Sequence, residues 1–245
     1  MAFPETRLTL IHRIASGGDD TAWKRFLADY WRPICLFAKR IGPLQWEDAE
    51  DVASQTIEIL NCKELINRWL ESPQSRFKTL VCGVVRNLVS NWSRSDRTRT
   101  RRLADYAAEW ESMATQVVPP DDVNMFYAIW ANEMIRGVVE ALMWQYHREN
   151  RGDYFRVLHG RICEQQTSKE IAAQLGIKLE DAENYYRHAR KRLTEQIEAA
   201  LRQEIERYAL NEDLDEEFRL EWGQLAAFFQ QQGGMEEAIR IAAAS

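Results

Sequence analysis

The sequence of 245 residues lacks the features that mark membrane-spanning, secreted and metal-binding proteins. No apolar run approaches the roughly 20 residues that a membrane-spanning helix requires, and the first residues contain no apolar signal core. The four cysteines never occur as Cys-x-x-Cys, and the four histidines show no spacing typical of metal ligands. We therefore expect a cytoplasmic protein that does not insert into membranes, keeps its cysteines reduced and binds no metal.

The residue arrangements that enzymes use are also missing. The sequence shows no paired carboxylates placed for acid–base catalysis, no nucleophile triad and no glycine-rich loop that would hold a phosphate. We therefore expect a protein that is not an enzyme, with no catalytic residue and no cofactor.

Strand-like alternation of apolar and polar residues is absent too, whereas apolar residues recur every three or four positions along most of the chain. This period predicts an all-α fold. The length suffices for two domains of modest size, and the clearest linker is Thr115–Asp122, where Pro119 and Pro120 end any preceding helix. The predicted organisation is one helical domain over 1–113, a linker over 114–123, a second helical domain over 124–208 and a C-terminal helical extension over 209–245.

Residues 167–193 predict two helices joined by a tight turn. Thr167 and Glu170 have the spacing of a capping box, and Gly176 ends the first helix. The second helix has an apolar face and, opposite to it, a polar face that contains several cations. Such a pair suits the major groove of DNA, which admits one helix and is read by its outward side chains. The candidate DNA-contacting residues are Lys178, Asn184, Tyr185, Arg187, His188 and Lys191.

A purely structural interpretation of this helix pair stays open. Pairs of helices with glycine at the turn also occur in bundles that bind no nucleic acid. In addition, Glu180, Asp181 and Glu183 near the start of the second helix favour its dipole but repel phosphates.

Basic charge is concentrated in one segment, although the formal net charge of the chain is −6. The segment from Arg86 to Arg102 contains six arginines and one aspartate, and it overlaps the end of a helix predicted over Phe77–Trp92. Arginines three and four residues apart can neutralise successive phosphates, and asparagines offer donors and acceptors to bases. The alternative is an exposed basic helix end that complements its own dipole. The candidate DNA-contacting residues here are Arg86, Asn87, Asn91, Arg94 and Arg97.

The helix predicted over Trp46–Leu60 is acidic around a narrow apolar stripe. Its charges either form a solvated face or dock on a basic surface of a partner. The candidate partner-binding residues are Asp48, Glu50, Asp51 and Gln55. The tail after Tyr208 is acidic and then apolar, and its role is also left open. It either covers part of the chain, binds a partner or packs as a simple helix pair.

The order of these parts resembles the extracytoplasmic-function (group IV) sigma factors of bacterial RNA polymerase over about Asp20–Leu201. Three motifs support this resemblance. Asp48-Ala-Glu-Asp-Val52 with Gln55 is similar to the polymerase-binding helix of the family. Arg76-Phe-Lys-Thr-Leu-Val81 through Arg86-Asn-Leu88 is similar to its minus-ten-reading helix, and Lys169-Glu-Ile-Ala172 with Leu175-Gly-Ile177 to its minus-thirty-five-reading helix-turn-helix.

The resemblance implies that the first domain docks on core RNA polymerase, melts the promoter and holds a flipped base, while the second reads the upstream element. The expected partners are core RNA polymerase and promoter DNA, with an anti-sigma factor or another regulator as a further partner. Asn67, Arg68 and Trp69 would serve the base pocket, with a place in the core as the alternative for Trp69. Glu183, where the family usually has a basic residue, and the Tyr185–Tyr186 pair depart from the family pattern and affect which bases are read.

Two other functions stay open at this point. A helix-turn-helix transcriptional regulator that binds duplex operators without polymerase would contain the same helix pair. A sigma-like interaction protein that no longer reads DNA is the other, motivated by Glu183 and the acidic tail.

Overall fold

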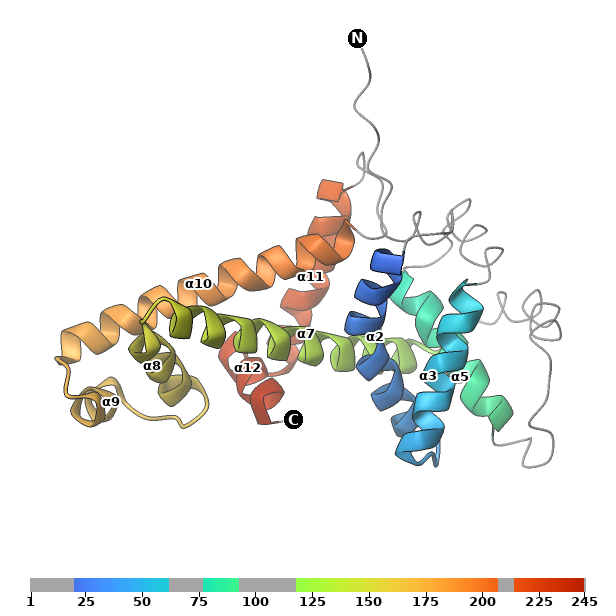
Figure 1. Cartoon of the computed structure of the whole chain (residues 1–245), viewed down its shortest axis with the longest axis horizontal. Helices are drawn as coiled ribbons and strands as arrows, with labels where there is room; N and C mark the ends of the chain where they lie inside the picture. Colours follow the sequence, from blue (N-terminus) through green and yellow to red (C-terminus); the bar gives the residue numbers. More distant parts are fainter. Residues whose placement is uncertain (1–19, 62–76, 93–117, 207–213, 245) are drawn as a thin grey trace, which may run out of the picture. The chain divides into compact units, whose positions relative to one another are not determined.

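The computed structural model describes residues 20–61, 77–92, 118–206 and 214–244 (Figure 1). Every regular element within these ranges is an α-helix, so the predicted all-α class is confirmed for them. Of the predicted DNA-contacting residues, five lie outside the described residues: Asn67, Arg68, Trp69, Arg94 and Arg97. No helix in the described ranges is both long and apolar enough to cross a lipid bilayer.

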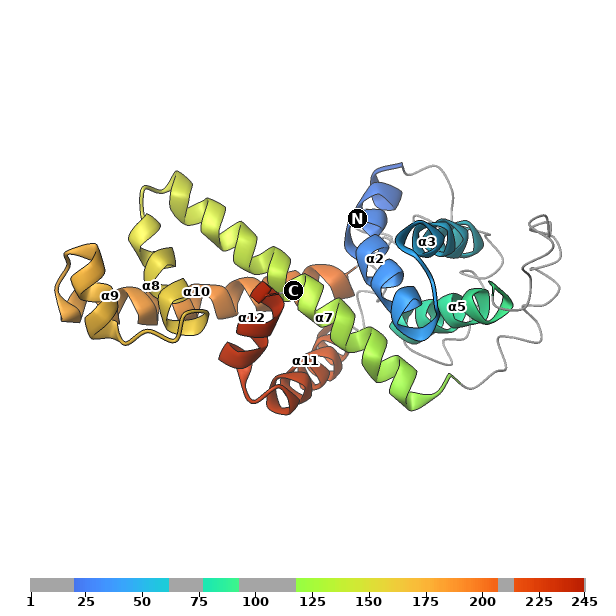
Figure 2. The ribbon, with the colours of Figure 1, turned by 90° about the horizontal axis from the view of Figure 1, so that it is seen from below.

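Contacts between Cα atoms divide the chain into two compact units, Met1–Trp130 and Ala131–Ser245. In the first unit, three helices pack on one another: α2 (Asp20–Ile41), α3 (Trp46–Asn61) and α5 (Phe77–Trp92) (Figures 1 and 2). Aromatic rings form much of this core, because Phe77 makes edge contacts with Phe26 and Tyr30, with centroids 5.9 and 5.7 Å apart.

Helix α7 (Pro120–Arg148) contributes to both units. Proline suits the first turn of a helix, where its missing N–H group has no intrahelical partner, and the N–H groups of Asp122 and Val123 donate to the Pro119 carbonyl. Phe126 packs edge-on against Phe37 at 5.3 Å, and the Lys78 ammonium lies 4.0 Å above the Trp130 ring. The first turns of α7 therefore belong to the core of the first unit, and the division between the units falls after the predicted linker of 114–123.

The second unit contains the rest of α7 and five more helices: α8 (Gly152–Ile162), α9 (Ser168–Leu175), α10 (Leu179–Ile205), α11 (Leu214–Gln231) and α12 (Met235–Ala244). The long helix α10 packs on α8, α9 and α11, and α12 packs on α8 and α11 (Figure 1). The C-terminal extension thus folds as two helices that pack within this unit.

The α9–α10 pair begins and turns as its local sequence predicts. The Thr167 hydroxyl accepts from the Glu170 N–H at 3.3 Å, and the Glu170 carboxylate accepts from the Thr167 N–H at 2.7 Å, which completes the capping box. Gly176 ends α9 in the left-handed conformation at φ 66°. Its N–H donates to the Ala172 carbonyl, so this orphan acceptor of α9 is satisfied.

Small residues let α9 and α10 pack closely on α8. Val157 of α8, Ile171 and Ala172 of α9 and Ala182 of α10 form one buried cluster. Gly160 lies at the close approach of α8 and α9, because a Cβ atom there would lie 3.0 Å from Cδ1 of Ile171. Three helices therefore share one small core, and this core sets the direction of α10.

Candidate nucleic-acid interface

The outward face of α10 is polar and open to solvent, as predicted. Four residues that recur along this face are all exposed: Glu180, Asn184, Arg187 and Lys191. On the opposite face Ala182, Ala189 and Leu193 are fully buried. Tyr186 has the spacing of the buried face, but it is only half-buried and its hydroxyl reaches a polar partner. The exposed face offers an amide, a guanidinium and an ammonium group to a ligand.

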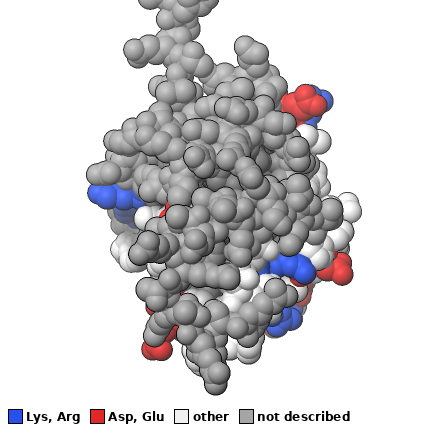
Figure 3. Space-filling model, turned by 90° about the vertical axis from the view of Figure 1, so that its right-hand side faces the viewer, with Lys and Arg blue, Asp and Glu red and all other residues white. Residues whose placement is uncertain are grey.

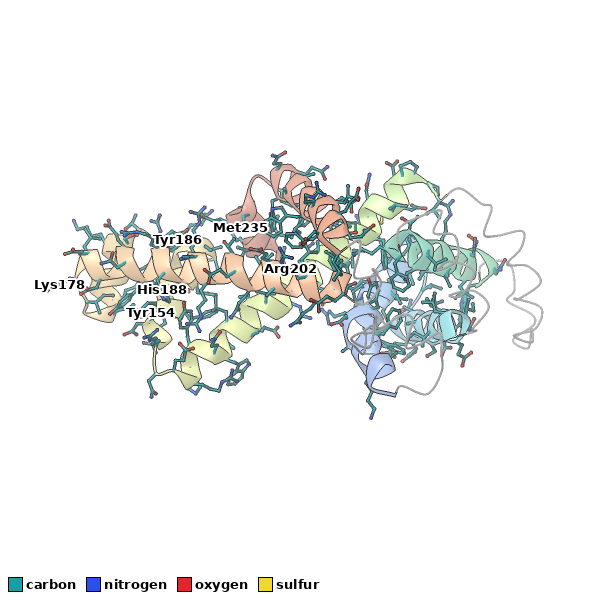
Figure 4. The ribbon with its side chains drawn as sticks, turned by 90° about the horizontal axis from the view of Figure 1, so that it is seen from above. Tyr154, Lys178, Tyr186, His188, Arg202 and Met235 are labelled. Atoms are coloured by element: carbon teal, nitrogen blue, oxygen red, sulfur yellow. The ribbon has the colours of Figure 1, made fainter. Side chains whose placement is uncertain are left out.

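Aromatic rings hold one flank of this face. Tyr185 of α10 stacks on Tyr154 of α8 with ring centroids 4.1 Å apart, and His188 meets the edge of Tyr154 at 5.1 Å. The hydroxyl of buried Tyr146 lies 3.2 Å from Nδ1 of His188. Figure 4 shows Tyr154 and His188 together on one side of α10. Two predicted DNA-contacting residues, Tyr185 and His188, are thus oriented by contacts within the second unit.

An ion pair anchors the same flank to the end of α7. Two nitrogens of the Arg192 guanidinium donate to the two carboxylate oxygens of Glu149, at 3.2 and 2.9 Å, and Gln145 donates to Glu149 at 3.0 Å. Desolvation opposes the charge of Glu149, but these hydrogen bonds prevail and lower its pKa. The guanidinium also lies 5.4 Å above the Tyr146 ring. The bidentate geometry fixes α10 against the end of α7.

The opposite flank of α10 carries the C-terminal helix. The Tyr186 hydroxyl donates to Oε1 of Glu236 at 2.6 Å, and Nε of Arg190 lies 3.2 Å from the same oxygen. Desolvation, together with the hydrogen bond to Glu236, raises the pKa of Tyr186 to about 12. In Figure 4, Tyr186 and Met235 lie on the side of α10 away from Tyr154. The tail therefore packs on the flank of the predicted DNA-reading helix.

Charge changes sign along the exposed face of α10. Glu180 and Asp181 lie in its first turn, and exposed Glu183 follows. Arg187, Arg190 and Lys191 come one to two turns later, and Lys178 directly precedes the helix. The acidic start stabilises the helix through its dipole but repels a phosphate backbone. The positive charge of this face is thus concentrated in the third and fourth turns of α10.

The predicted partner-binding residues of α3 are used partly within the helix itself. Asp48 accepts from the Gln45 N–H at 3.1 Å, and Glu50 accepts from the Trp46 indole N–H at 2.8 Å. Asp48 therefore stabilises the start of α3 in the manner of the reciprocal half of a capping box. Glu50 instead forms a side-chain pair with Trp46, one turn earlier on the same helix. Asp51 is exposed and Gln55 is half-buried. Among the four, only Asp51 is exposed.

Three of the predicted DNA-contacting residues lie in α5, and each of them is partly buried. Arg86 forms an ion pair with Asp122 in the first turn of α7, while Asn87 and Asn91 are half-buried. On the face drawn in Figure 3, the described charged side chains that are visible include both Lys or Arg and Asp or Glu. Arg86 therefore connects α5 to α7 and presents only part of its charge.

The described residues offer no metal centre, since no three His, Cys, Asp or Glu side chains among them are close enough to hold an ion. Described cysteines Cys35, Cys82 and Cys163 are free. Burial raises the pKa of Cys35 to about 11 and that of Cys82 to about 12, so both thiols stay protonated at neutral pH.

Sequence patterns missed four residues that shape this interface: Tyr146, Tyr154, Arg190 and Glu236. The i, i+4 spacing of Tyr186 and Arg190 places them on one flank of α10, and this signal was available from the sequence. Their partner Glu236 is distant in sequence, so only the packing of the tail identifies it.

Comparison of the chain with protein-family models, with curated proteins and with solved structures gave no match.

Proposed function

We propose that the protein is a sigma factor, which binds core RNA polymerase and directs promoter recognition and transcription initiation. The observation that carries this proposal is the α9–α10 pair. It has a capped first helix, a glycine turn and a second helix whose outward face exposes Asn184, Arg187 and Lys191. We interpret this pair as a helix-turn-helix.

In this proposal, the second unit reads the upstream promoter element with α10 in the major groove. Arg187 has the fork of donors that matches guanine, and Asn184 has the donor and acceptor that match adenine. Lys191 is a point charge suited to a phosphate. The core shared by α8, α9 and α10 supports the proposal, because base reading requires a helix held rigidly.

The first unit is proposed to dock on the polymerase through α3 and to contact the minus-ten region through α5. The exposed Asp51 and the half-buried Gln55 support the first role, and Asn87 and Asn91 support the second. Complementary charge between an acidic helix and a basic polymerase surface would speed association.

The acidic residues at the start of α10 are consistent with a protein that binds DNA within a larger assembly. Exposed Glu180 and Glu183 weaken attraction to DNA when the chain is free. Two modest DNA contacts gain strength when both are held on one polymerase, because the second contact then forms at a high effective concentration.

The test is reconstitution of the purified chain with core RNA polymerase on fragments of genomic DNA from the same cell. The proposal predicts retention of the chain on the polymerase and transcripts with defined start points. Absence of both would refute it.

The same acidic residues favour one alternative, a sigma-like interaction protein that no longer reads DNA. That protein would join the polymerase but give no defined starts with any fragment. A polymerase-independent regulator would instead show tight operator binding by the free chain, as a dimer on two half-sites.

A further inference from the structure

Two donor groups meet one carboxylate on the flank of α10 that faces α12, and a third cationic group lies nearby. The Tyr186 hydroxyl donates to Oε1 of Glu236 at 2.6 Å, and Nε of Arg190 lies 3.2 Å from that same oxygen. The Arg161 guanidinium of α8 lies 5.2 Å from the centre of the Tyr186 ring. Its Nε is buried and has no acceptor among the described residues. One carboxylate oxygen thus accepts from Tyr186 and pairs with Arg190, while the positive charge of Arg161 lies over the Tyr186 ring.

This site borders the face that is proposed to meet DNA. Arg190 follows Arg187 by three residues, which places it about 60° around the helix axis from Arg187. A helix in the major groove has base edges in front of it and a phosphate backbone along each flank. Residues on the flank of α10 therefore meet phosphates rather than bases.

We infer that Tyr186 and Arg190, with the charge of Arg161 nearby, form a binding site for one phosphate of the DNA backbone, which Glu236 occupies when DNA is absent. The inference rests on the proposed role of α10 in contacting DNA. A hydroxyl and a guanidinium group at one anionic oxygen are suited to a phosphodiester, whose oxygens accept the same charge-assisted hydrogen bonds as a carboxylate.

Glu236 can leave the site without unfolding α12. Its side chain is 49% exposed and belongs to the first turn of that helix, whereas Ala238, Ile239 and Ala242 anchor the helix in the core. An exposed ion pair contributes little to stability, so rotation of the Glu236 side chain into solvent is inexpensive. The tail thereby lowers the affinity of α10 for DNA without covering the base-reading face.

The test is the substitution Glu236→Gln in the full chain, with binding to a mixed-sequence DNA duplex measured by fluorescence anisotropy at several salt concentrations. The amide keeps the size of the side chain but removes the charge that competes with phosphate. One additional phosphate contact steepens the slope of log K against log salt by about 0.9, so the gain in affinity from 200 to 50 mM salt becomes about 3.5-fold larger.

Glu237→Gln is the matched control. Glu237 is also an acid in the first turn of α12, but its hydrogen bonds run to Arg240 of the same helix. Both substitutions change the net charge by the same amount, and both remove an acid that interacts favourably with the dipole of α12. The inference predicts that Glu237→Gln leaves the salt slope near that of the unsubstituted chain.

Arg190→Ala completes the test. In the Glu236→Gln background it should remove the gained affinity, whereas in the unsubstituted chain it should have a smaller effect, because Glu236 already competes for Arg190. This coupling is what a double-mutant cycle measures.

Three results would overturn the inference: equal effects of Glu236→Gln and Glu237→Gln, no change with Glu236→Gln, or a gain that persists after Arg190→Ala. Failure of the proposed function is a separate result, since it is read from polymerase retention and defined transcript starts rather than from duplex affinity. A steeper slope in a chain that does not join polymerase would support the phosphate site and refute the sigma factor.

Discussion

Removal of the Thr167 hydroxyl is the most direct perturbation of the helix pair. In Thr167→Ala, α9 loses the side-chain acceptor of the Glu170 N–H, at 3.3 Å, and the hydroxyl that donates to the Glu170 carboxylate at 2.7 Å. The contact from the Thr167 N–H to the same carboxylate survives, because it belongs to the backbone. Half of the capping box therefore remains in the variant.

Loss of a threonine N-cap destabilises a helix by about 1 kcal/mol. Hydrogen exchange of single amides is the suitable assay, because a chain with two compact units need not unfold in one step. A loss of this size makes amides that open with α9 exchange about fivefold faster. The amide of Ile171, which donates to the Thr167 carbonyl at 3.1 Å, is one reporter.

The effect also depends on pH, through Glu170. Hydrogen bonds from the Thr167 backbone and side chain lower the pKa of Glu170 below its ordinary value of 4.5. A lowered pKa in the folded state means that the cap contributes stability above the unfolded value and loses it as pH falls through the folded pKa. In the unsubstituted chain, the stability of α9 should therefore fall between neutral and acidic pH. In Thr167→Ala this fall, measured as the loss of protection of the α9 amides against exchange, should be smaller.

Thr167→Ser is the control for this experiment, because serine keeps the hydroxyl and should exchange like the unsubstituted chain. If Thr167→Ala left the α9 amides unchanged, or if Thr167→Ser accelerated them as much, the capping argument would be refuted.

Three further predictions test packing and binding. Gly160→Ala should be less stable than Gly137→Ala by about 1–3 kcal/mol and should therefore unfold at a lower temperature in calorimetry. The reason is that a Cβ atom at position 160 meets Ile171 at 3.0 Å, whereas one at position 137 meets nothing within 4 Å. Equal melting of the two would contradict this close packing. Asp51→Lys should weaken binding to core polymerase in a pull-down titration, while the charge reversal Asp181→Lys, in the other unit, should not; equal losses would argue against docking through α3. Arg187→Ala and Asn184→Ala should each change promoter preference in a competition assay, whereas Lys191→Ala should weaken all promoters alike, and three identical profiles would refute separate base and phosphate roles.

Local sequence was sufficient to predict most helices, since their signals lie within a few residues. The predicted helix over Phe77–Trp92 matches α5. Thr167, Glu170 and Gly176 predicted the bounds of α9, because capping and left-handed termination depend on neighbours in sequence. The exposed face of α10 was predicted by the helical period alone.

Other features were not accessible in this way, because they join distant segments. Tyr186 has the spacing of a core residue, yet its hydroxyl reaches Glu236, fifty residues later. Arg86 has the spacing of a phosphate contact, yet it pairs with Asp122 of α7. A helical period shows which face is buried but not which side chain from another helix meets it.

The sequence by itself therefore determined an all-α chain, the capped and glycine-terminated α9 and the polar outward face of α10, because hydrogen bonds and periodicity within one or two turns specify them. Only the tertiary structure decided what borders that face. Tyr154 and Glu149 hold one flank, and Glu236 occupies the other. These contacts depend on how α7, α8 and α12 pack around α10, and packing between distant segments follows from the shape and charge of whole surfaces rather than from local pattern.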